Sequence, residues 1–167
     1  FEIFDFIAFV FLTPILAEIF FPKDMASKAV WFTYLTIAIS YLLRPIGGII
    51  LGHLGDKYGR KSVFSISILL MSVPSFIIGI LPGYAQIGYF ATVLLIISRI
   101  LQGFSVGGEV PGSITYIAEK FKHSNYFFAC AWLTFGANFA VSVGSQLIKL
   151  LTKYAGHDFM YSYGWRI

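Results

Sequence analysis

The sequence predicts an all-α integral membrane fold, a single domain over residues 1–167 with about five transmembrane helices. Hydrophobic residues make up 57% of the 167 residues and charged residues only 12%, about half of the share found in soluble domains. The mean hydropathy is +0.79. Apolar residues are gathered in stretches long enough to cross the hydrocarbon core of a bilayer as helices, and most charges lie between these stretches. We therefore expect the chain to be surrounded by lipid.

The first two expected spans carry charges inside otherwise apolar sequence. The first covers residues 3–21 and includes Asp5 and Glu18. The second covers residues 30–52, and Arg44 is its single charge. A charge at membrane depth costs at least about 2.5 kcal/mol, so such side chains usually face the protein interior or an aqueous cavity.

Three further spans follow. The third covers residues 62–81, carries no charge and ends before a Pro-Gly turn dipeptide. The fourth covers residues 89–118 and places Arg99 and Glu109 near the middle of the membrane. The fifth covers residues 126–150. The chain thus alternates apolar spans with short polar links.

Residues 52–62, here called the signature segment, separate the second and third spans. They read GHLGDKYGRKS and hold Asp56, Lys57, Arg60 and Lys61 together with Gly52, Gly55 and Gly59. We expect a tight glycine-containing loop that reverses the chain. Lysines and arginines at the span ends number five on each side, but the contrast with the uncharged link after the third span favours a cytoplasmic position.

Six residues form the candidate site: Glu2, Asp5, Arg44, Arg99, Gln102 and Glu109. Two interpretations remain open. The charges could act as interhelical clamps, with Asp5 or Glu2 paired to Arg99 and Glu109 paired to Arg44. Alternatively they line a cavity and couple a substrate to protons. Three carboxylates face two arginines, so burial of the excess carboxylate favours proton binding, and Asp5 or Glu109 is the expected proton carrier.

Small residues at four-residue spacing predict close helix packing, because they let backbones approach each other in lipid. These residues are Gly48 and Gly52 in the second span, Gly103, Gly107, Gly108 and Gly112 in the fourth, and Gly136, Ala140 and Gly144 in the fifth.

Several function classes are not supported by the sequence. The three histidines are scattered and do not show metal-ligand spacing, and no phosphate-binding glycine loop joins a strand to a helix. We therefore expect no metal, no cofactor and no enzyme activity. The net charge is +4, but the cations lie at span ends and do not form a basic surface, so nucleic acid is not an expected partner.

Three motifs resemble those of a known family. The signature segment is similar to the G-x-L-x-D-R-x-G-R-R/K pattern between spans 2 and 3 of the major facilitator superfamily. LLRPIGG (residues 42–48) and RILQGFSVGGE (residues 99–109) resemble its metabolite:proton symporter branch. The similarity is greatest to the proline/betaine type, with the citrate, α-ketoglutarate and shikimate types close behind. Thr134 stands where the proline/betaine type carries an acid.

The resemblance implies a twelve-span symporter of the inner (plasma) membrane, with two six-span halves that alternate access to a central site. Such a protein would carry a small metabolite, such as proline, betaine or a carboxylate, together with protons. It implies that Asp56 and Arg60, with Gly52, Gly59 and Lys61, belong to a conformational latch. It also matches Asp5 and Arg99 to a coupled carboxylate–arginine pair. The C-terminal spans, absent from this sequence, would be the partner surface.

Two other functions stay open. The chain could be a non-transporting membrane polypeptide, either a gene relic or a five-span scaffold. It could also belong to a sugar-type facilitator that works without protons.

Overall fold

The computed structural model describes residues 2–22, 26–120, 126–154, 157–162 and 164–166. Within this part of the chain, five helices are long and apolar enough to cross a membrane: α1 (Glu2–Phe20), α2 (Ala26–Tyr58), α3 (Arg60–Ile80), α5 (Tyr89–Lys120) and α6 (Tyr126–Tyr154). The shorter elements are α4 (Tyr84–Ile87), α7 (His157–Ser162) and the 3-10 turn η2 (Gly164–Arg166). The all-α membrane class is confirmed.

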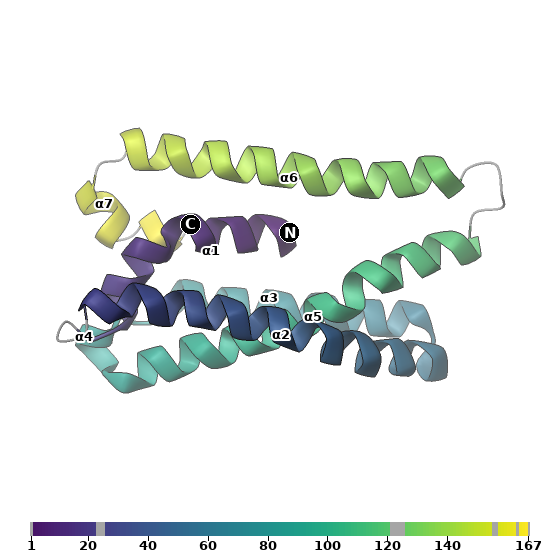
Figure 1. Ribbon diagram of the computed structural model, residues 1–167, viewed down its shortest axis with the longest axis horizontal. Helices are drawn as coiled ribbons and strands as arrows, with labels where there is room; N and C mark the ends of the chain where they lie inside the picture. Colours follow the sequence, from purple (N-terminus) through teal and green to yellow (C-terminus); the bar gives the residue numbers. More distant parts are fainter. Residues whose placement is uncertain (1, 23–25, 121–125, 155–156, 163, 167) are drawn as a thin grey trace.

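Helix α1 lies between α6 and the group formed by α2, α3 and α5 (Figure 1). Helix α5 packs most extensively against α2 and next against α3, whereas α6 rests mainly on α1. Helices that follow one another in the sequence are therefore not always neighbours in space. The fourth long helix contacts the first three, which brings residues about ninety positions apart in the sequence to one place.

Glycines on both helices allow the close approach of α2 and α5. A Cβ atom added to Gly107 would lie 1.9 Å from the carbonyl oxygen of Arg44, and one added to Gly103 would lie 2.4 Å from that of Ser40. The close packing expected at Gly103 and Gly107 is confirmed. At Gly52, Gly112 and Gly136 such a Cβ meets no atom of the described residues within 4 Å, so within this part of the chain the same spacing does not create a helix contact there.

The prediction of a loop over residues 52–62 is wrong for most of these residues. Helix α2 continues to Tyr58 and α3 begins at Arg60, so the only break is Gly59, with a φ of 89°. One glycine in the left-handed region is enough to end a helix. At 33 residues, α2 is about 50 Å long, which exceeds the roughly 30 Å hydrocarbon core. Its last turns can therefore carry charges outside the hydrocarbon.

The apolar core gathers along α1, from the middle of the helix to its end. Phe9, Leu16 and Phe20 are buried there, and the carbonyl oxygen of Phe20 accepts a hydrogen bond from Thr92 of α5 at 2.5 Å. The ring of Trp165 in η2 meets Phe20 edge to face, with 5.2 Å between the centroids. The C-terminal segment is thus packed against the end of α1.

Helix α7 adds a polar contact to this packing. Partial burial and the neighbouring Glu18 carboxylate of α1 raise the pKa of the Tyr161 phenol. Glu18 is exposed, as expected for a charge near the end of a span.

Candidate functional site

An ion pair between α1 and α5 is the centre of the candidate site. Nη1 of Arg99 donates a hydrogen bond to Oδ2 of Asp5 at 3.0 Å. The Arg99 side chain is 9% exposed and that of Asp5 27%, so the pair has one buried partner and one that reaches the edge of the interior. Of the two partners considered for Arg99, the structure shows Asp5 in place.

The surroundings of Arg99 favour a buried cation. Phe9, one turn after Asp5 on α1, places its ring centroid 3.5 Å from Cζ of Arg99, a distance at which the ring quadrupole attracts the guanidinium. Removing one partner from a buried ion pair costs about 3–5 kcal/mol, because the other charge stays buried without compensation. The pair therefore ties α1 to α5 as long as Asp5 is ionised.

Two neutral side chains extend the ion pair into a network. Ser75 of α3 lies with its hydroxyl oxygen 3.3 Å from Oδ1 of Asp5. Nε2 of Gln102, on the same helix as Arg99, donates to that hydroxyl at 2.6 Å. Gln102 is 4% exposed. The network thus joins α1, α3 and α5, and Asp5 contacts both of the other helices.

A small cavity lies beside the network. Its volume is about 170 Å³, below the roughly 300–1,000 Å³ of ordinary ligand pockets and larger than the roughly 30 Å³ that one water occupies in the liquid. Asp5, Ser75 and Arg99 line it together with Trp165 and Arg166 of η2, and the rest of the lining is mostly apolar. This space suits water and protons better than a metabolite.

Arg44 and Glu109 do not join this network within the described part of the chain. The guanidinium of Arg44 lies over the ring of Tyr41, 4.1 Å from its centroid, and 5.7 Å from the Phe6 centroid. Glu109 is partly buried and forms no ion pair with a described residue, so the pairing of Glu109 with Arg44 considered above is not seen. Its Oε2 is buried without a hydrogen-bond partner in the described part of the chain. The Glu2 side chain lies outside the described residues.

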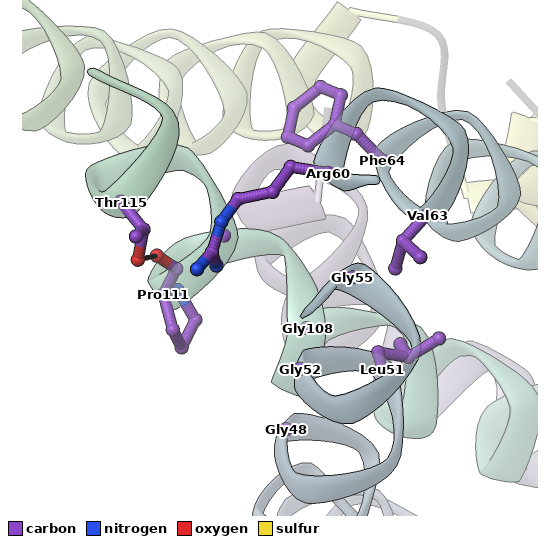
Figure 2. A pocket seen from close by; sticks show the side chains of 11 residues that line it. Gly48, Leu51, Gly52, Gly55, Arg60, Val63, Phe64, Gly108, Pro111 and Thr115 are labelled. Atoms are coloured by element: carbon purple, nitrogen blue, oxygen red, sulfur yellow. Dashed lines mark hydrogen bonds between the residues drawn. The ribbon is translucent and has the colours of Figure 1, made fainter. Parts of the chain in front are cut away.

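The signature segment forms a second polar cluster, at the end of α2. Nη2 of Arg60 donates to Oδ1 of Asp56 and its Nε to Oε1 of Glu119, both at 2.9 Å. Figure 2 shows the Arg60 side chain extending from the start of α3 toward Thr115 of α5. Arg60 lines a shallow groove of about 60 Å³ together with Gly52 and Gly55. Lys61 is exposed and does not line this groove. Arg60 therefore connects the ends of α2, α3 and α5.

Some members of these clusters could not be selected from the sequence. Ser75 lies in a span with no charge, where serine is common, and Phe9 is one of 18 phenylalanines. Glu119 lies beyond the residues expected in the fourth span. Ser75 is identified only by its contacts in the folded chain, with Asp5 of α1 and Gln102 of α5. Among the described residues, no group of three or more His, Cys, Asp or Glu is placed to hold a metal ion.

Five apolar helices, a buried ion pair between two of them and a charged cluster at one end define a multi-pass helical membrane protein with a charged pair in its interior. The Major Facilitator Superfamily matches residues 2–167, and the chain belongs to this family.

Within this family, the chain is similar to proteins named as transporters of proline and betaine. The chain is 37% identical over 166 residues to the proline/betaine transporter of Salmonella typhimurium (strain LT2). It is 36% identical over 166 residues to the glycine betaine/proline/ectoine/pipecolic acid transporter of Dickeya dadantii (strain 3937). Both alignments cover 99% of this chain and 33% of the relative, so the chain spans about a third of the length of these relatives. No solved structure matches it. The resemblance inferred from the sequence motifs is confirmed.

Proposed function

We propose that the protein is a proton-coupled symporter of a small zwitterionic osmolyte, of the proline or betaine kind, in the inner (plasma) membrane. The observation that carries the proposal is the Asp5–Arg99 ion pair at the edge of a small cavity. The family and the names of the relatives indicate transport and not enzyme catalysis. The relatives' names also supply the substrate class.

The ion pair suggests how a proton would change the structure. While Asp5 is ionised, its ion pair with Arg99 links α1 to α5, with 3.0 Å between Oδ2 of Asp5 and Nη1 of Arg99. A proton on Asp5 removes the negative charge and with it the Coulomb attraction, so the link between the helices weakens. Arg99 keeps its charge, because a guanidinium does not lose its proton in proteins. It then becomes available to a substrate carboxylate, which links proton binding to substrate binding.

Arg44 and Glu109 have proposed roles as well. Arg44, which lies against two aromatic rings, is a second cation for a substrate carboxylate. Glu109 is the alternative proton carrier, because its Oε2 is buried on the helix that also carries Arg99. Glu2 remains a candidate from the sequence alone.

Uptake by the full-length protein tests the proposal. In cells without their own osmolyte uptake, the protein should concentrate labelled proline or glycine betaine, and a protonophore should abolish this accumulation. Accumulation of α-ketoglutarate or citrate instead would place the substrate among the carboxylates. Uptake that the protonophore leaves unchanged would favour a proton-independent facilitator. No uptake of any of these would favour a non-transporting polypeptide.

We further propose that the signature segment is a conformational latch whose central residue is Arg60. The support is its pair of contacts, one to Asp56 on α2 and one to Glu119 on α5. The remaining spans of the full-length protein would meet this end of the bundle when the two halves close. Gly52 and Gly59 keep the surface near Arg60 free of side chains, and Lys61 adds charge.

For the latch, the Arg60→Gln variant separates stability from transport. Asp56 and Glu119 are more than half exposed, and exposed ion pairs contribute only about 0–1 kcal/mol each. We therefore expect almost unchanged thermal unfolding in detergent but a several-fold slower uptake rate. Lys153→Gln, which removes an exposed cation in the last turn of α6 and outside the signature segment, is the matched control and should leave both nearly unchanged. Normal uptake by the Arg60 variant would exclude a latch role.

A further inference from the structure

We infer that Ser75 is a positioning residue for Asp5, and that its hydroxyl proton turns between two acceptors as Asp5 gains or loses a proton. This inference rests on the proposed role of Asp5 as the proton carrier. It adds a third helix, α3, to the response, since Ser75 is the α3 residue that contacts the Asp5 carboxylate.

The geometry around the hydroxyl is specific. The Ser75 oxygen lies 3.3 Å from Oδ1 of Asp5 and 3.0 Å from the carbonyl oxygen of Met71, one turn earlier on α3. It also accepts a hydrogen bond from Nε2 of Gln102 at 2.6 Å. A serine hydroxyl has a single proton to donate. It can therefore donate to Asp5 or to Met71, but not fully to both.

The charge of Asp5 decides between the two acceptors. An ionised carboxylate is a stronger acceptor than a peptide carbonyl, because hydrogen bonds to charged groups are roughly twice as strong as neutral ones. Once Asp5 is neutral this advantage is lost, and the shorter contact to Met71 is favoured. Gln102 holds the oxygen in place throughout, so the hydroxyl rotates while its oxygen stays fixed.

Few other charged side chains lie near Asp5. The cavity beside it contains two further titratable or charged side chains among the described residues, Arg99 from α5 and Arg166 from η2. Both are guanidinium groups that remain charged over the physiological range. Among the described side chains that line this cavity, Asp5 is therefore the one whose charge can change, and Ser75 is the neutral group that can respond to that change.

Ser75 lies at a point of α3 where a change in its hydrogen bond can bend the helix. Ser75 directly follows Pro74, a buried proline inside the helix. Proline lacks an N–H and so removes one helical hydrogen bond, which makes bending easier at that point. A hydrogen bond gained or lost by Ser75 acts at this weakened turn.

The test measures the pH dependence of uptake by the full-length transporter reconstituted in liposomes. Ser75→Ala removes a donor to the ionised carboxylate, which favours the protonated form. The pH of half-maximal uptake should therefore rise, by about one unit for a hydrogen bond to a charged group. Ser75→Thr keeps a hydroxyl and should restore the original midpoint. Ser72→Ala is the matched control, because Ser72 is exposed on the same helix and its hydroxyl donates to the backbone carbonyl of Leu69, one turn earlier.

Each outcome decides one statement. A midpoint that does not move in Ser75→Ala, or that moves equally in Ser72→Ala, overturns the inference. If Ser75→Ala is not recovered in membranes, Ser75→Cys replaces it, since a thiol is a weak donor of similar size, and the same upward movement is expected. The Asp5→Asn variant separates the two proposals. If the uptake of Asp5→Asn keeps the pH dependence of the wild-type protein, the proton role of Asp5 is refuted. If Asp5→Asn loses the pH dependence but the midpoint of Ser75→Ala does not move, only the role of Ser75 is refuted.

Discussion

The Asp5→Asn variant of the full-length transporter is expected to lose proton-driven accumulation of substrate altogether. Asparagine has nearly the same shape as aspartate but cannot take up a proton near neutral pH. Its side-chain oxygen can still accept the hydrogen bond from Arg99 that Oδ2 accepts at 3.0 Å. The imposed pH gradient should therefore no longer concentrate substrate, and the internal concentration should only reach the external one. Labelled substrate uptake into liposomes with an acidic exterior measures this.

Two controls show whether coupling, and not folding, was lost. Exchange of labelled for unlabelled substrate requires no net proton movement and should persist in Asp5→Asn. Its thermal stability should fall, because Arg99 stays buried without its counter-charge. Glu18→Gln neutralises the exposed carboxylate at the other end of α1 and should accumulate substrate normally. Full accumulation by Asp5→Asn would shift the proton role to Glu109.

The second large effect is expected from Gly107→Ala, which should prevent stable folding. The added Cβ would lie 1.9 Å from the carbonyl oxygen of Arg44 and 2.6 Å from the backbone nitrogen of Gly48. Backbone atoms cannot move aside as the end of a side chain can, so α2 and α5 must separate. Overpacking costs about 1–3 kcal/mol in soluble cores, and here it affects the largest helix contact in the described part of the chain. Thermal unfolding in mild detergent and the yield of monodisperse protein measure it.

Gly112→Ala is the matched control on the same helix. An added Cβ there meets no atom of the described residues within 4 Å, and replacing glycine by alanine in a helix interior is favourable by roughly 1 kcal/mol. We expect equal or slightly higher thermal stability. If both alanine variants unfold alike, the close approach of α2 and α5 at Gly107 is not what stabilises the bundle.

The sequence predicted the membrane class because long apolar stretches are a local property. It did not predict where α2 ends. The charges and glycines of residues 52–62 are typical of a loop, yet the helix continues to Tyr58. Charged residues are compatible with a helix that extends beyond the hydrocarbon, and a single glycine, Gly59, provides the reversal. Composition alone does not distinguish such an extension from a loop.

For the candidate site, the sequence selected charges and could not fully assign partners. Asp5 and Arg99 were identified because charges are costly in lipid, and the structure brings them together. Glu109 and Arg44 were selected on the same grounds, but an ion pair between them is not formed. Ser75 was missed because a serine carries no such cost. Its importance comes from its contacts with Asp5 of α1 and Gln102 of α5, which no local pattern reveals.

The most direct test of proton-coupled symport is the movement of protons caused by substrate itself. The full-length transporter is reconstituted in liposomes that contain a pH-sensitive dye, with equal pH on both sides. Addition of external proline or glycine betaine should acidify the interior in the wild-type protein and not in Asp5→Asn. Substrate entry without acidification in the wild-type protein would contradict the proposal and would identify a transporter that does not use the Asp5–Arg99 pair to carry protons.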